Sequence, residues 1–252
     1  MRPAQTDNVR VAAIIVAATC ALAAPLTLAD QPAATGLRPY TATFKVAFKG
    51  FGAGHLELKL VAGPEPGHWR FETVPRPVLL ARIWLSADAR ERGDFVVTDA
   101  AVVPQYYRFD GGSNHDNDVE LKYDWPNKRV TGTWHGRPLD LTLEPGAQDP
   151  MSVRAAILVE LQAGRTRADI TMIDDAKLKT FEYRLTGSAE MPAPGGPVQT
   201  DVYESRAKGE QGGRYIRHWY APSLDYLPVR VEQFDSDHKS RLLFVLTALR
   251  FE

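Results

Sequence analysis

The most polar stretch of the chain runs from Asp110 to Asp118 and reads Asp-Gly-Gly-Ser-Asn-His-Asp-Asn-Asp. The side-chain oxygens of Asp110, Asn114, Asp116 and Asp118 are of the type that ligates Ca²⁺. The spacing departs from the EF-hand loop, because Val119 follows Asp118 where the turn needs a glycine. Asn, Asp, Gly and Ser are also the usual residues of an exposed hairpin end. We therefore expect no metal site, and these four residues are the closest approach to one.

His115, in the same segment, is a candidate general base. A neighbouring carboxylate can orient an imidazole as a general base, so His115 with Asp110, Asp116 or Asp118 could form a hydrolase site. The chain has no Gly-x-Ser-x-Gly nucleophile elbow. Its six histidines form no His-x-x-x-His or His-Glu-x-x-His pair of the zinc-protease type. The hydrolase remains an alternative, and it requires these side chains to converge with a second catalytic group in one pocket.

Asp149 allows a catalytic and a structural interpretation. It precedes Pro150, which suits the first position of a helix because its missing N–H loses nothing there. Gly164 is a typical helix stop. One apolar stripe lies between them, formed by Val153, Ile157, Leu158 and Leu161. A carboxylate at this place accepts hydrogen bonds from free backbone N–H groups. We interpret Asp149 as a structural helix cap rather than a carboxylate in a cleft.

Large aromatic side chains are the remaining candidates for a binding site. They are Trp69, Trp84, Trp125, Trp134, Trp219, Tyr106, Tyr107 and Tyr220. Such residues line ligand grooves, and more often they fill the core of a β protein. The sequence does not decide between these roles. Our candidates for ligand binding are Trp84, Tyr107, Trp125, Trp134, Leu158 and Trp219.

Period-two alternation of apolar and polar residues dominates the chain after residue 38 and predicts strands with one buried face. In the segment Tyr40–Phe48, every second residue is apolar. Similar segments follow at 56–60, 69–73, 119–125, 139–143, 177–190, 198–206, 214–220, 226–234 and 239–251. Glycine- and proline-rich turns separate them. The apolar segment 78–85 fits either a short helix or a buried strand.

These elements predict an all-β, mainly antiparallel fold with one helix at about 149–163. A sheet of this many strands tends to curl or close. We expect a large curved sheet, a half-open barrel or a meander, with the helix on its concave face. Any part of that face left uncovered would be a groove for an apolar ligand. We expect residues 30–38 to be a flexible lead and residues 39–252 to form a single domain.

The first 29 residues resemble an export signal. Arg2 and Arg10 precede an uncharged apolar run from Val11 to Leu22, and Ala29 ends a small-x-small cleavage pattern. An alternative cut lies near Ala23 or Ala24. The apolar run is shorter than a membrane-spanning helix needs, so we expect removal rather than a retained anchor.

Cys20, the only cysteine, lies inside this signal, so the mature chain would contain no disulfide and no thiol nucleophile. Its preceding residues match a lipoprotein signal poorly. The signal holds two arginines and one aspartate of a chain with 30 Lys+Arg and 31 Asp+Glu, which leaves the mature chain a net charge of -2. This balance gives no long-range attraction to nucleic acid or anionic lipid.

Several short motifs in the second half carry a family resemblance. They are Gly146–Ser152, Asp174-Asp175, Glu182-Tyr183, Glu190, Trp219–Pro222 and Leu227–Arg230. The pattern resembles the bacterial envelope family known as domain of unknown function 3108, over roughly residues 38–251. The resemblance implies an exported all-β protein and supplies no catalytic residue. At fold level only, the chain is also similar to the curved half-barrels of periplasmic lipoprotein carriers.

Our leading hypothesis is a non-catalytic periplasmic protein that binds an apolar ligand or an envelope partner on a curved sheet. We expect no cofactor, no nucleic-acid partner and no transmembrane span in the mature chain. The alternatives are the hydrolase described above and an envelope assembly factor that works through an exposed sheet edge.

Overall fold

The computed structural model describes residues 36–79, 86–98, 101–113, 115–209 and 213–252. The expected signal peptide and most of the 78–85 segment lie outside the described residues, as do two candidate site residues, Trp84 and Asn114.

The described residues form fourteen strands in a single antiparallel sheet. The first eight strands are β1 (Tyr40–Phe48), β2 (Phe51–Ala62), β3 (His68–Pro77), β4 (Arg90–Val97), β5 (Val102–Asp110), β6 (Val119–Asp124), β7 (Arg129–Trp134) and β8 (Arg137–Thr142). Helix α1 (Ser152–Gln162) follows them. The remaining strands are β9 (Arg167–Asp174), β10 (Lys177–Ala193), β11 (Gly196–Ala207), β12 (Tyr215–Ala221), β13 (Leu227–Phe234) and β14 (Ser240–Phe251). Two short 3₁₀ turns are η2 (His115–Asn117) and η3 (Pro222–Leu224).

The sheet consists of two meanders joined through the first and last strands. Strands β1 to β8 pair consecutively, and so do β9 to β14. The meanders meet where β1 pairs with β14, from Tyr40 opposite Phe251 to Phe48 opposite Leu242. The outermost strands are therefore β8 and β9, which are consecutive strands in the chain. Helix α1 lies in the connection between them and is therefore placed at the opening of the sheet.

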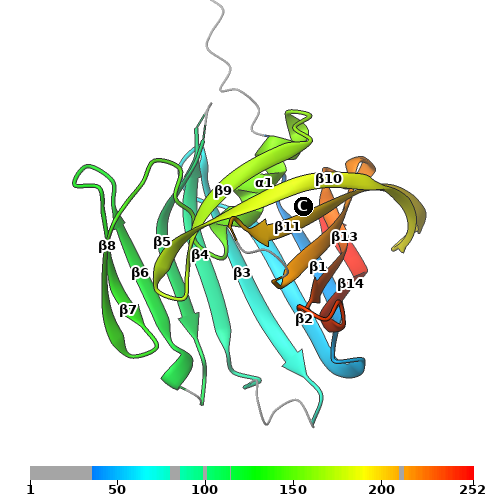
Figure 1. Cartoon of the computed structure of the whole chain (residues 1–252), viewed down its shortest axis with the longest axis horizontal. Coiled ribbons are helices and arrows are strands. Elements are labelled where there is room, and N and C mark those ends of the chain that lie inside the picture. Colours follow the sequence, from blue (N-terminus) through cyan, green and yellow to red (C-terminus); the bar gives the residue numbers. More distant parts are fainter. Residues whose placement is uncertain (1–35, 80–85, 99–100, 114, 210–212) are drawn as a thin grey trace, which may run out of the picture. The chain divides into compact units, whose positions relative to one another are not determined.

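The predicted fold class is confirmed: the sheet is curved and open, and a single helix accompanies it in the described part of the chain. Figure 1 shows the strands curving around α1, which contacts β4, β5 and β9. The helix begins at Ser152 rather than at Asp149, because Asp149, Pro150 and Met151 form the turn that caps it.

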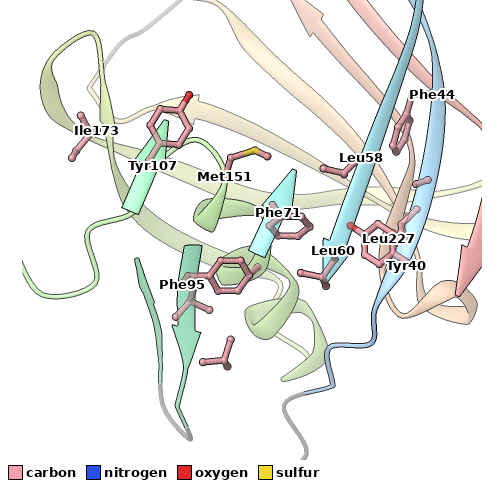
Figure 2. Packing of buried hydrophobic residues seen from close by; sticks show 14 of the residues in the cluster. Tyr40, Phe44, Leu58, Leu60, Phe71, Phe95, Tyr107, Met151, Ile173 and Leu227 are labelled. Carbon is pink, nitrogen blue, oxygen red and sulfur yellow. The ribbon is translucent and has the colours of Figure 1, made fainter. Parts of the chain in front are cut away.

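The helix divides the buried side chains into two clusters. The larger cluster joins side chains of β1 to β8 with the residues that lead into α1, and it extends to β9 and β11 to β14 (Figure 2). In it, the rings of Phe71 and Phe95 stack with their centroids 5.5 Å apart, and Met151 is fully buried. Gly93 allows this packing, since a Cβ atom there would lie 2.5 Å from that of Met151. The smaller cluster joins Val153, Ile157 and Leu161 of α1 to side chains of β9 to β12.

Gln148 ties the two outer parts of the sheet together just before α1. Its backbone N–H donates to the carbonyl of Thr171 and its carbonyl accepts from Ile173 N–H, both at 2.9 Å, so it pairs with β9. Its side-chain Nε2 donates to the carbonyl of Val102 in β5, also at 2.9 Å. Gln148 is 2% exposed. One residue therefore connects β9 to β5 across the opening and fixes where α1 starts.

This connection predicts a large effect of Gln148→Met. The variant keeps the side-chain length but leaves the buried carbonyl of Val102 without its donor, which typically costs ~1–3 kcal/mol. Urea unfolding measures the change in the free energy of unfolding. Gln105→Met is the matched control. Gln105 is exposed in the same strand as Val102, and its Nε2 donates to the carbonyl of Val103, two residues away. Equal stabilities of the two variants would contradict the role assigned to Gln148.

Candidate functional site

A cavity of about 290 Å³ lies between α1 and the half of the sheet centred on the β1–β14 junction. Its walls are mainly apolar and aromatic side chains. They come from β1 (Tyr40, Phe44), β2 (Leu56, Leu58), the helix and its lead-in (Pro150, Val153, Arg154, Ile157, Leu158), β9 (Met172), β10 (Tyr183), β12 (Ile216, His218, Tyr220), β13 (Pro228, Val231) and β14 (Phe244).

Regular secondary structure brings these residues to one space. On β12 the lining residues are 216, 218 and 220, every second residue, because alternate side chains of a strand share a face. On α1 they are 153, 154, 157 and 158, which share one face of a helix. The cavity is therefore bounded by the concave face of the sheet on one side and by one helix face on the other.

On the cavity wall opposite α1, the polar side chains of β10, β11 and β12 contact one another. Ser205 Oγ lies 3.0 Å from His218 Nε2, and the imidazole stacks on Tyr220 with ring centroids 5.4 Å apart. The ring of Tyr183 contacts the same imidazole at 5.6 Å. Burial raises the pKa of the Tyr183 hydroxyl to about 12, and it raises the pKa values of Tyr40 and Tyr220 as well. These hydroxyls are all neutral at physiological pH.

The Ser205–His218 pair has the atoms of a nucleophile and a base but not the required electrostatics. Burial, followed by the nearby charge of Arg154, lowers the pKa of His218 from 6.5 to about 3. An imidazole of that pKa is a weak proton acceptor at neutral pH. Among the described residues, no carboxylate forms a hydrogen bond with His218 that would orient its imidazole. The pair is a cross-strand hydrogen bond in an aromatic wall rather than a catalytic dyad.

Arg154 is the charged residue of the cavity lining. Among the described residues that line the cavity, it is the one Arg, Lys, Asp or Glu. It lies in the first turn of α1 and is exposed to solvent. Its positive charge lowers the pKa values of Tyr40, Tyr183, Tyr220 and His218, although burial has the larger influence on each. The guanidinium therefore lies within electrostatic reach of the cavity walls.

Asp149 lies at the start of the helix and is fully buried. Its Oδ1 accepts hydrogen bonds from the backbone N–H groups of Met151 and Ser152, both at 2.8 Å. In return, its own N–H donates to Ser152 Oγ at 2.9 Å. This reciprocal pattern is that of a helix capping box, with serine in the place of the usual Glu or Gln. The carboxyl thus anchors the turn that sets the direction of α1.

The second oxygen of Asp149 has a different environment. Neither Asp149 Oδ2 nor the hydroxyl of Tyr123 has a hydrogen-bond partner among the described residues, although both are buried. The carboxyl contributes to raising the pKa of Tyr123, after desolvation, which shows that the two groups are close. Glu91 lies nearby and accepts a hydrogen bond from the hydroxyl of Tyr107 at 2.8 Å. Burial raises the pKa of Asp149 from 3.8 to about 7, against the lowering effect of its hydrogen bonds.

The polar loop 110–118 connects β5 to β6 and is separate from the cavity lining. Ligand atoms of Asp110, His115 and Asp118 lie within 4.8 Å of one another. Each carboxylate already has partners inside the loop: Asp110 accepts from Gly112 N–H and Arg108, and Asp118 accepts from Gly111 N–H and contacts His115 Nδ1 at 3.1 Å. The hydrogen bonds to Asp110 lower the pKa of its carboxyl. Asp116 is exposed.

The ligand-binding candidates from the sequence lie in different places. Leu158 lines the cavity. Tyr107, Trp125, Trp134 and Trp219 are outside its lining and pack elsewhere. Tyr107 bonds to Glu91, Trp125 Nε1 donates to the carbonyl of Pro104 at 2.7 Å, and Trp134 packs against the ring of His135. Trp219 lies against the guanidinium of Arg230, 5.1 Å from the ring centroid.

Sequence reasoning missed Arg154 and most of the tyrosine wall. A signal was present in the helix, where Arg154 stands between the apolar residues Val153 and Ile157 on the side of the helix that the stripe occupies. A cation in that position is exceptional for a face expected to pack against a core. The alternation of Ile216, His218 and Tyr220 likewise marks one face of a strand.

The raised pKa of Asp149 predicts how stability depends on pH. The folded state keeps this proton above the pH at which an unfolded aspartate loses it, so stability falls as the pH rises from about 4 towards 7 and then levels off. From pH 5 to pH 8 the contribution of this one group is a loss of ~2–3 kcal/mol. Asp149→Asn keeps an acceptor for the two N–H groups and removes the titration.

Urea unfolding of the protein and of Asp149→Asn at pH 5 and pH 8 measures this contribution. The difference between the two pH values should shrink in the variant by ~2–3 kcal/mol. Asp116→Asn is the control, because Asp116 is an exposed aspartate in the 110–118 loop. An Asp149→Asn variant with the same pH dependence as the control would show that the Asp149 carboxyl titrates normally.

Comparison with known proteins bears on the fold. A structure described as a β-barrel-like protein of domain of unknown function DUF1849 from Brucella abortus is 13% identical to this chain, covers 86% of it and 98% of its own length, and gives a TM-score of 0.54. The crystal structure of MucB, also 13% identical, covers 86% of this chain and 54% of its own, with a TM-score of 0.37. The first match shows a shared fold, and its identity is too low to transfer a function.

No curated protein matches the chain. A family model described as "Protein of unknown function (DUF3108)" matches residues 40–241, from the first strand to the start of the last. The match includes the Gln148–Ser152 segment that positions the helix. The chain belongs to this DUF3108 family, as its sequence motifs predict.

Proposed function

We propose that this protein is a non-catalytic binding protein that takes an apolar ligand into the cavity between α1 and the curved sheet. The observation that carries the proposal is the cavity itself, about 290 Å³ of space with mainly apolar walls beside an otherwise closely packed core. Protein interiors rarely leave such spaces, since unfilled apolar volume destabilises the fold. Small-molecule sites are typically concave and apolar with few polar groups, as here.

The chemistry of the other polar clusters supports a binding role over a catalytic one. In the 110–118 loop, the carboxylates of Asp110 and Asp118 accept hydrogen bonds from backbone N–H groups of the loop, and Asp116 is exposed. The imidazole of His218 is too weak a base to activate Ser205. Asp149 is sealed beneath the helix and its Oδ1 serves the helix cap. Each of these potentially reactive side chains therefore has a structural role that explains its position.

Export to the periplasm is part of the same proposal and rests on the signal-like pattern of residues 1–29. Across the described segments of the chain, no helix has the length and apolar character that a membrane span requires. An envelope location would give a carrier of apolar molecules a clear use, because such molecules partition poorly into the aqueous periplasm.

A bulky residue in the cavity should weaken ligand binding. Val231 lines the cavity and is only partly buried, so Val231→Trp can project into the free volume without displacing a core residue. We expect the affinity for the neutral apolar probe N-phenyl-1-naphthylamine to fall by about ten-fold or more, since a filled site loses the apolar contacts of the ligand. Fluorescence titration measures it.

Val103→Trp is the matched control, because Val103 is a partly buried valine in β5 that lies outside the cavity lining. Its probe affinity should equal that of the unchanged protein. Native mass spectrometry and lipid extraction of protein purified from the periplasm give an independent measurement. A protein that carries no apolar molecule and binds the probe equally in both variants would contradict the proposal.

A further inference from the structure

Arg154 is a guanidinium at an apolar cavity, and the residues that the structure describes hold no counter-ion for it. The described residues provide no ion pair and no side-chain hydrogen bond to Arg154. Two arginines of the second meander show the paired alternative: Arg167 pairs with Glu182 at 3.0 Å, and Arg230 pairs with Glu232 at 2.6 Å. Within the described segments this charge is therefore left for a ligand to neutralise.

The position of Arg154 in the helix adds to its positive field. The first turn of a helix carries the positive end of the macrodipole, which favours acidic side chains and disfavours cations. The first turn of α1 contains no acidic residue. The Asp149 carboxyl already caps this helix terminus, so folding gives no reason to add a cation here, whereas an anionic ligand would gain from the guanidinium.

The helix terminus alone does not provide the anion site, because its N–H groups are occupied. Met151 N–H and Ser152 N–H donate to Asp149 Oδ1. Val153 N–H donates to the carbonyl of Asp149, and Arg154 N–H donates to that of Met151. Direct contact with an anion must therefore come from the guanidinium of Arg154.

The groups that face Arg154 across the cavity are neutral. Burial keeps the hydroxyls of Tyr40, Tyr183 and Tyr220 protonated, and the low pKa of His218 keeps its imidazole uncharged. A negative charge brought to this place meets no like charge from the walls that line the cavity. Neutral hydroxyls at the same wall can also donate hydrogen bonds to an oxyanion.

We infer that the ligand of this cavity is an amphiphile with one anionic head group, bound as an ion pair to Arg154, and an alkyl chain that fills the space behind it. The inference rests on the proposed binding function and specifies its ligand class. Arg154 is exposed at the solvent side, so the head can stay hydrated while the chain is buried. A guanidinium suits carboxylates and phosphates equally, because it can donate two parallel hydrogen bonds.

The cavity volume limits the length of the chain. A cavity of ~150 Å³ accommodates benzene, so a cavity of about 290 Å³ has room for on the order of a dozen carbon atoms. Dodecanoate, dodecyl phosphate and dodecanol are therefore suitable probes: they share one alkyl chain and differ in the charge and shape of the head.

Isothermal titration of the purified protein at pH 7.5 tests the inference. We expect both anions to bind at least about ten-fold more tightly than dodecanol, the effect of one charge-assisted hydrogen-bonded pair. Arg154→Gln should remove this preference and leave the dodecanol affinity within about two-fold. Arg154→Lys should keep part of the preference through its charge. Arg165→Gln is the control, because Arg165 lies just past the other end of α1, 3.8 Å from Glu160.

The outcomes separate the two proposals. Equal binding of the three compounds, unchanged in Arg154→Gln, would overturn the anionic head group while leaving the apolar site standing. Absence of binding by all three, dodecanol included, would overturn both. A preference for one anion over the other tells a carboxylate ligand from a phosphate lipid, and either supports the inference. A thermal melt of each variant confirms that a loss of binding does not arise from unfolding.

Discussion

The attachment of one short helix across the opening of a curved sheet is the constraint on which this structure depends. The two outermost strands, β8 and β9, form the ends of the sheet, and the connection between them contains the helix. Two successive residues, Gln148 and Asp149, fix the position of this connection. Gln148 joins β9 to β5 through its backbone and side chain, and Asp149 closes the first turn of α1. Because both residues are buried, either interaction is worth more than its exposed equivalent.

Fixing the helix in this way fills one half of the concave face and not the other. Towards β3, β4 and β5, the lead-in to α1 presses Met151 against Gly93, and the aromatic residues Phe71 and Phe95 complete a dense core. Towards β1, β2 and β12 to β14, the same helix lies farther from the sheet and a cavity remains. The absence of a side chain at Gly93 brings the helix close on one side, so the volume of the cavity follows from where the helix is held.

The sequence predicted the strands and the helix, because both depend on local periodicity. Residues 40–48 alternate as a strand with one buried face, and Asp149 with Pro150 marks the helix start. The pairing of β1 with β14 depends on contacts between residues two hundred positions apart, for which alternation contains no information. The cavity lining could not be predicted for the same reason. The bulky Trp125 and Trp134 drew attention by type, yet they pack outside the lining, while the smaller Ile216 and Val231 border the space.

The fold that this chain shares with other proteins therefore says less about its function than the few side chains that line its cavity. The similar β-barrel-like structure shows that this architecture tolerates very different sequences. In this chain a space remains between the helix and the curved sheet, and its chemistry is decided by the residues at the helix face and on the opposite strands. In this chain those residues are aromatic and aliphatic, with a single guanidinium at the first helical turn. An apolar wall gives affinity without selectivity. The charge of Arg154 is the feature able to select one class of apolar molecule from the others, because a neutral head would leave the guanidinium without a counter-ion.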